Sequence, residues 1–77
     1  MTGVQTCALP ICTRVAQKVG EEAIELVLAA TAGTRDEQLE EAADLMFHLL
    51  VLLRTKNISL QAVSQKLQDR HEMANKD

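Results

Sequence analysis

The segment at residues 45–53 constrains the fold most, because every position in it except His48 is apolar. It is far shorter than the ~20 residues that a membrane-spanning helix needs. A helix that is apolar nearly all round belongs at the centre of a structure. Two other helices of one small chain can cover only part of it. We therefore predict that a second subunit covers the rest, which makes the protein a homodimer.

The composition indicates an all-α protein of one small domain. The 77 residues are 47% hydrophobic and include only three glycines and one proline, and good helix formers dominate the rest. A chain of this length is near the lower limit at which a single core is stable, and a metal or a second subunit commonly adds stability. The net charge of −3 disfavours nucleic acid as a partner.

Capping signals divide the chain into three predicted helices. Thr34 with Glu37 three residues later forms a capping box at the start of the second helix. Asn57, which tolerates left-handed geometry, ends that helix, and Ser59 caps the third. Because both connections are short, we predict antiparallel neighbours in a helical bundle. The predicted helices span about 13–31, 35–55 and 60–74.

Two glycines carry structural expectations. Gly33 follows the first helix, where we expect it to supply the left-handed residue that ends a helix. Gly20 lies in the middle of that helix, where glycine costs up to ~1 kcal/mol relative to alanine. We therefore expect a close neighbour at Gly20, either another helix or a ligand.

Four carboxylates in two matched pairs form the candidate site. Glu22 and Glu25 lie three apart in the first predicted helix, and Glu41 and Asp44 lie three apart in the second. Side chains three apart share a helix face, with Cβ atoms roughly 5–6 Å apart. Two antiparallel helices would bring the four acids together, where they repel unless a cation neutralises them. Hard divalent cations take oxygen ligands, so we predict a Mg²⁺ site.

The first residues are expected to lie outside the folded domain. Residues 1–11 show no periodicity and match the in-frame translation of a common sequencing-adapter oligonucleotide; a genuine disordered leader is the alternative. We therefore divide the chain into a leader at 1–12 and a helical domain at 13–77, and expect the natural start of the domain to be missing. That missing segment is an alternative cover for part of the apolar second helix. The spacing of Cys7 and Cys12 is no metal or redox motif, which favours a reducing, cytoplasmic setting.

Two sequence strings, KVGEEAIELVLAA and EEAADLMFHLLVLL, carry a family resemblance. With the loop and helix start that follow, they resemble phosphoribosyl-ATP pyrophosphatase, of the MazG-type all-α nucleotide pyrophosphatase superfamily. The resemblance covers residues 13 to about 70. The superfamily pattern is EExxE, a spacer and then ExxD. Here the pattern is filled by Glu21, Glu22 and Glu25 and then by Glu41 and Asp44.

The resemblance implies a dimeric Mg²⁺ enzyme of histidine biosynthesis. The reaction is hydrolysis of the α–β phosphoanhydride of phosphoribosyl-ATP to phosphoribosyl-AMP and pyrophosphate, the second step of the pathway. The resemblance also implies fusion to, or joint action with, phosphoribosyl-AMP cyclohydrolase, and a basic loop before the first helix that is missing here. The metal would polarise phosphate oxygens and lower the pKa of an attacking water. The implied catalytic and metal-binding residues are Glu22, Glu25, Glu41 and Asp44.

Three further residues are candidates for binding substrate. Lys18, one turn before Glu22, is placed to reach a phosphate, although it could instead only pair with Glu22 at i+4. Glu21 could position water or a second ion, or belong to a solvated helix face. His48 lies one turn after Asp44 on the same face, where it could support the site or be an ordinary hydrogen-bonded core histidine.

Two other functions compete with the histidine-pathway enzyme. One is a MazG-type house-cleaning pyrophosphatase that acts on free nucleoside triphosphates with the same metal chemistry. The other is a catalytically inactive helical dimerisation module, which predicts no affinity for metal. The two long strings favour the histidine-pathway enzyme, and the intact set of four acids argues against the inactive module.

Overall fold

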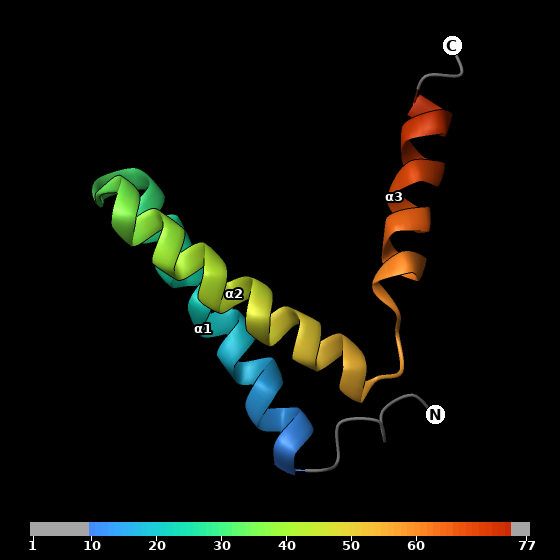
Figure 1. Ribbon diagram of the computed structural model, residues 1–77, viewed down its shortest axis with the longest axis horizontal. Helices are drawn as coiled ribbons and strands as arrows, with labels where there is room; N and C mark the ends of the chain where they lie inside the picture. The colour runs from blue at the N-terminus through green and yellow to red at the C-terminus, as the bar shows by residue number, and fades with distance from the viewer. Residues whose placement is uncertain (1–9, 75–77) are drawn as a thin grey trace.

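The computed structural model describes residues 10–74, which contain helices and no strand. The predicted all-α class and the three helices are confirmed. The first helix begins three residues earlier than predicted, at a proline, whose restricted backbone suits the first position of a helix. Residues 1–9 of the predicted leader lie outside the described residues. The helices are α1 (Pro10–Ala32), α2 (Arg35–Thr55) and α3 (Leu60–Ala74) (Figure 1).

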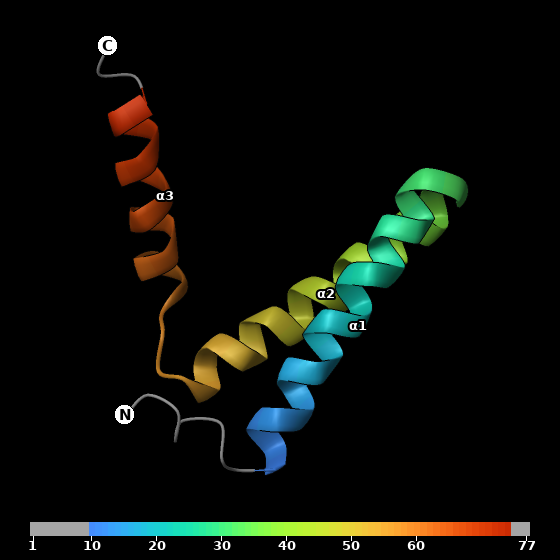
Figure 2. The same cartoon turned by 180° about the vertical axis from the view of Figure 1, so that it is seen from behind.

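The helices α1 and α2 form an antiparallel hairpin, and both views show them side by side (Figures 1 and 2). The predicted capping box is present at the start of α2. The Thr34 amide donates to Glu37 Oε1 at 2.8 Å, and the Glu37 amide donates to Thr34 Oγ1 at 3.1 Å. Gln38 Nε2 donates across the hairpin to the Ala29 carbonyl at 3.1 Å. These bonds hold the turn that sets the two helices against each other.

The two glycines in this hairpin differ in the space around them. Neither has a positive φ, so the left-handed stop expected at Gly33 is wrong. Instead, a Cβ on Gly33 would lie 2.7 Å from Glu37 Oε1 and 3.0 Å from the Ala29 backbone, so this position lacks room for a side chain. At Gly20, a Cβ would meet no described atom within 4 Å. Residues 10–74 therefore place no neighbouring helix against Gly20.

The helix α2 ends in a Schellman motif, as the predicted stop at Asn57 requires. Asn57 has φ 58°, its amide donates to the Arg54 carbonyl at 3.1 Å, and the Ile58 amide donates to the Leu53 carbonyl at 2.9 Å. Such a motif satisfies carbonyls that the helix end would leave unpaired. The predicted cap of α3 is also confirmed, because Ser59 Oγ accepts from the Ala62 amide at 3.0 Å.

The helix α3 projects away from the hairpin, as both views show (Figures 1 and 2). Within residues 10–74, extensive packing between helices is confined to α1 and α2. The antiparallel packing predicted for α3 is therefore wrong. A short link brings helices together only when its backbone turns the chain back, and the link after Asn57 directs it outward. The apolar residues Leu60 and Leu67 of α3 are consequently exposed.

The hydrophobic core of this single chain is small. Cys12, Val15 and Ala29 are its buried apolar residues in the described range, and α2 contributes none. The central position predicted for residues 45–53 is therefore not reached within one chain, and Phe47 is 62% exposed. One packed neighbour covers only one side of a helix that is apolar on several.

Cys12 is disulfide-bonded, which the cysteine spacing did not predict; Cys7 lies outside the described residues. No helix in the described part of the chain has the length and apolar character required to cross a membrane.

Candidate functional site

The hairpin places the two acid pairs on facing helices, with Glu22 and Glu25 on α1 and Glu41 and Asp44 on α2. The side chains of Glu25 and Glu41 lie close enough for Glu25 to raise the pKa of the Glu41 carboxyl group. The arrangement therefore brings two of the predicted site residues into direct contact across the hairpin.

Glu41 is the acid whose negative charge is destabilised by the other carboxylates of the site. Burial raises the pKa of its carboxyl group, and so do the side-chain interaction with Glu25 and the charges of Glu25, Asp44 and Glu22. Its Oε1 atom is buried and has no hydrogen-bond partner among residues 10–74. Buried oxygen atoms are normally paired, so this atom marks a place where a positive charge or a donor would be favourable.

Glu22 has a different environment, because histidine and lysine partners surround its carboxylate. It is 6% exposed, and a buried carboxylate requires such partners. His48 Nδ1 on α2 lies 2.6 Å from Glu22 Oε1. Lys18 Nζ lies 3.9 Å from Glu22 Oε2, in the i,i+4 pairing that the sequence suggested. The contact between His48 and Glu22 joins α1 to α2, which the position of His48 on the helix face of Asp44 does not by itself predict.

The other predicted substrate-binding residues lie at the edge of this cluster. Glu21 is exposed, and its Oε2 accepts a hydrogen bond from Gln17 Nε2 at 3.2 Å. The side chain of Lys18 is 45% exposed, which leaves its ammonium accessible to a ligand. The aromatic ring of Phe47 meets the His48 ring edge to face, with centroids 5.0 Å apart. The sequence reasoning missed this aromatic contact, since Phe47 reads only as an apolar residue.

An open hollow of about 440 Å³ adjoins the acids. Its wall combines the Glu25–Glu41 pair with apolar side chains and with the turn of the hairpin. Glu37, which sequence reasoning recognised only as a capping residue, also contributes to it. The lining residues are Glu25, Leu28, Ala29, Ala32, Gly33, Glu37 and Glu41.

The side chains of the four acids do not converge on one point as the ligands of a bound cation would. Across residues 10–74, no group of three or more His, Cys, Asp and Glu side chains has an arrangement that could hold a metal ion. The carboxylates instead pair off, Glu22 with His48 and Glu25 with Glu41. Carboxylate oxygens are nevertheless the ligands that Mg²⁺ prefers. The unpartnered Glu41 Oε1 has no positively charged group beside it among the described residues. The donor chemistry of this residue set therefore fits a hard divalent cation.

The raised pKa of Glu41 predicts a pH-dependent stability for the metal-free protein. A pKa that is higher in the folded than in the unfolded chain means that folding takes up a proton. The contribution of Glu41 to stability is therefore fully present below its unfolded pKa and is lost as pH rises through the folded pKa. We expect wild type to be less stable than Glu41→Gln in EDTA, and the difference in unfolding free energy to grow as pH rises from the unfolded toward the folded pKa of Glu41. Urea unfolding of both proteins over this pH interval measures it. Parallel profiles for the two proteins would contradict this account.

Comparison with known proteins identifies the family of this chain. Residues 5–71 match the family described as phosphoribosyl-ATP pyrophosphohydrolase. A segment of 59 residues, 77% of this chain, is 54% identical to histidine biosynthesis bifunctional protein HisIE of Vibrio cholerae serotype O1 and covers 28% of that protein. The HisIE protein of Campylobacter jejuni is likewise 54% identical over 59 residues, 77% of this chain and 28% of the relative.

The bifunctional HisIE protein of Salmonella typhimurium is 52% identical over 59 residues, 77% of this chain and 29% of the relative. The chain thus spans less than a third of the length of these curated relatives. No solved structure matches it. Since the family match covers most of the 77 residues and includes both acid pairs, the chain belongs to the phosphoribosyl-ATP pyrophosphohydrolase family.

Proposed function

We propose that this chain hydrolyses the α–β phosphoanhydride of phosphoribosyl-ATP to phosphoribosyl-AMP and pyrophosphate, the pyrophosphohydrolase step of histidine biosynthesis. The observation that carries the proposal is the family match over residues 5–71, which includes two acid pairs on facing helices. The charge pattern supports it, because the pKa of Glu41 is raised by burial and then by its acidic neighbours. A cluster of acids repels a negatively charged phosphate substrate. It therefore suits a reaction on such a substrate only if a cation lies between the acids and the phosphate.

Mg²⁺ is the cation that we propose for this site, held by Glu22, Glu25, Glu41 and Asp44. When bound, it would supply polarisation of the phosphate oxygens and a lowered pKa for a bound water. Glu25 and Glu41, which interact with each other, must first separate to admit the cation. The raised pKa of Glu41 opposes binding of the cation, because a hard cation binds the ionised carboxylate.

Two residues of α1 are proposed to act on substrate or water. Lys18 Nζ lies 3.9 Å from Glu22 Oε2, beyond hydrogen-bond distance, so little holds the ammonium group in place. Its flexible stem and partial exposure allow it to pair with a substrate phosphate. Glu21 is exposed beside Glu22, where its carboxylate could orient a water or a second ion.

We also propose that the chain forms a homodimer, because its apolar surface is too extensive for an isolated hairpin. If this holds, light scattering should give twice the chain mass of 8.5 kDa. Met46→Glu, in the middle of this surface, should shift the protein to monomer, whereas Glu40→Gln on the same helix should not. A wild-type monomer would contradict the proposal and favour cover by a segment outside this chain. The exposed apolar residues of the hairpin include Ile24, Val27, Leu28, Leu39, Met46, Phe47 and Leu50.

The bifunctional names of the relatives bear on the partner of this domain. HisIE proteins of Vibrio cholerae and Salmonella typhimurium are described as bifunctional, and this chain aligns with less than a third of each. We propose that the domain works with a phosphoribosyl-AMP cyclohydrolase, which would consume the phosphoribosyl-AMP that it releases.

The proposed activity is tested by pyrophosphate release from phosphoribosyl-ATP and from a panel of free nucleoside triphosphates, each with Mg²⁺ or with EDTA. Release from phosphoribosyl-ATP alone, and only with Mg²⁺, is the expected result. Release from free triphosphates alone would move the chain to the house-cleaning class. If the folded protein releases no pyrophosphate from any of these substrates, the proposed activity of this chain is overturned.

A further inference from the structure

His48 makes contacts that fix its ring from several directions. Nδ1 lies 2.6 Å from Glu22 Oε1 on the opposite helix and 3.2 Å from the carbonyl of Asp44, one turn earlier on α2. The Phe47 ring meets the imidazole at an interplanar angle of 80°. One nitrogen atom thus joins the side chain of one proposed cation ligand to the backbone of another.

The two partners of Nδ1 settle where the imidazole proton lies. A carboxylate oxygen and a backbone carbonyl are both acceptors, so Nδ1 must carry the hydrogen and donate it. This assignment holds whether the ring is neutral or charged. The bond to Glu22 is therefore a donation to an anion, the stronger and shorter kind of hydrogen bond.

The two oxygen atoms of Glu22 have different partners. Oε1 is taken by His48, and Oε2 faces the Lys18 ammonium at 3.9 Å. Oε2 is thus already turned toward a positive charge without being hydrogen-bonded to it. It is the oxygen that remains available for a metal cation.

We infer that His48 is a positioning residue, which holds Glu22 in place for the cation, and that it does not itself bind the substrate. This inference rests on the proposed cation site. Outer partners that hydrogen-bond a metal ligand fix its orientation, and their loss typically lowers metal affinity about 10–100-fold. The assignment replaces the substrate-binding role that the sequence suggested for His48.

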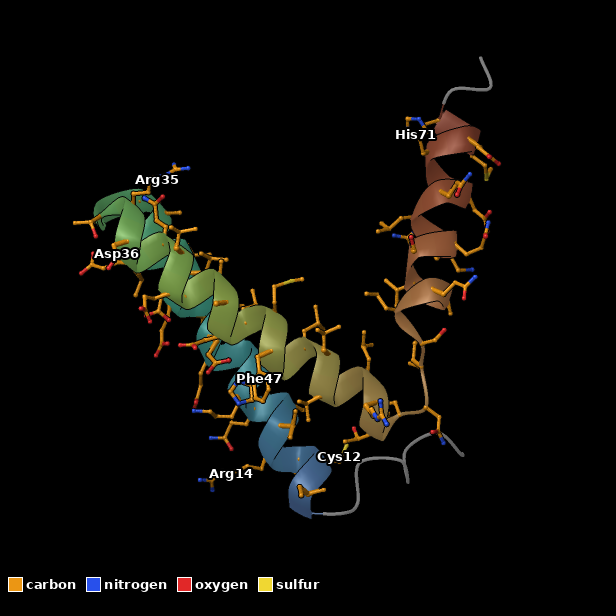
Figure 3. The ribbon with its side chains drawn as sticks, viewed as in Figure 1. Cys12, Arg14, Arg35, Asp36, Phe47 and His71 are labelled. Carbon is orange, nitrogen blue, oxygen red and sulfur yellow. The ribbon has the colours of Figure 1, made fainter. Side chains whose placement is uncertain are left out.

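The inference is tested by Mn²⁺ binding, followed by the electron paramagnetic resonance signal of the free ion. His48→Ala should raise the Kd for Mn²⁺ about 10–100-fold. His48→Asn, whose amide can donate in place of Nδ1–H, should recover part of the affinity. The matched control is His71→Ala on α3, remote from the hairpin (Figure 3), which should leave the Kd unchanged. At saturating Mn²⁺, the KM for phosphoribosyl-ATP should be the same in wild type and His48→Ala.

Several outcomes would overturn the inference. An unchanged Kd for Mn²⁺ with a raised KM in His48→Ala would assign His48 to the substrate instead. Wild-type protein that binds no Mn²⁺ would remove the cation site, and with it both this inference and the proposed function. If His48→Ala does not fold, nitrogen-15 NMR of metal-free wild type still decides the hydrogen bond, since a proton on Nε2 alone would exclude donation from Nδ1.

Discussion

Glu41→Gln should lower Mg²⁺-dependent pyrophosphate release from phosphoribosyl-ATP by at least about 100-fold, since loss of even an outer partner of a metal ligand costs about 10–100-fold. Glu41 lies where the charges of Glu22, Glu25 and Asp44 add up, and its Oε1 has no hydrogen-bond partner in the described part of the chain. An amide in its place removes the charge and leaves the shape nearly unchanged. The proposed cation would therefore lose an anionic ligand while the hairpin stays folded.

The same substitution should stabilise the protein in EDTA, because it removes an acid that its neighbours destabilise. The matched control is Glu40→Gln, which removes one charge from the adjacent, exposed position of α2 and should leave both activity and unfolding close to wild type. The measurements are turnover with saturating Mg²⁺ and urea unfolding in EDTA. Full turnover by Glu41→Gln would exclude this residue from the cation site.

Gly33→Ala and Gly20→Ala should change stability in opposite directions. A Cβ at Gly33 would lie 3.0 Å from both Cα and the carbonyl oxygen of Ala29 and 2.7 Å from Glu37 Oε1. The backbone at Ala29 cannot move without disturbing α1, and displacing Glu37 breaks its bond to the Thr34 amide. We therefore expect a loss of about 1–3 kcal/mol, as for overpacking of a well-filled site.

Gly20→Ala should instead stabilise the protein by up to about 1 kcal/mol, the helix propensity difference between the two residues. A Cβ there meets no described atom within 4 Å beyond its own stretch of helix, so nothing among the described residues opposes the larger residue. Urea unfolding of both variants beside wild type gives the two signs directly. Destabilisation by Gly20→Ala would contradict the open position and indicate that a second subunit packs against it.

The helices of this protein follow from local sequence. Thr34 and Glu37 stand three apart, and they form the predicted capping box. Asn57 takes the left-handed conformation that ends α2, and Ser59 caps α3. Each feature depends on hydrogen bonds between residues a few positions apart, so adjacent side chains suffice to specify it. The spacing of the acids along each helix is determined in the same way.

Contacts between helices could not be predicted from such local signals. The angle at which α3 leaves the hairpin depends on the backbone of its link and on the surfaces available to it, and a short link alone misled the prediction. The glycine at position 33 was interpreted as a conformational requirement, whereas it provides space for the Ala29 backbone and Glu37. Steric room of this kind exists only once both helices are in place.

In the candidate site, too, local sequence determines some features and contacts between helices determine others. Helix periodicity alone predicts that Glu22, Glu25, Glu41 and Asp44 occupy one face of each helix. Periodicity treats these acids as equivalent, but the folded hairpin does not. His48 donates to Glu22, while Glu41 carries an unpartnered oxygen and a raised pKa. The difference arises because side-chain rotamers and burial depend on the opposite helix, so the order of residues along one helix cannot specify which acid is stabilised and which is repelled.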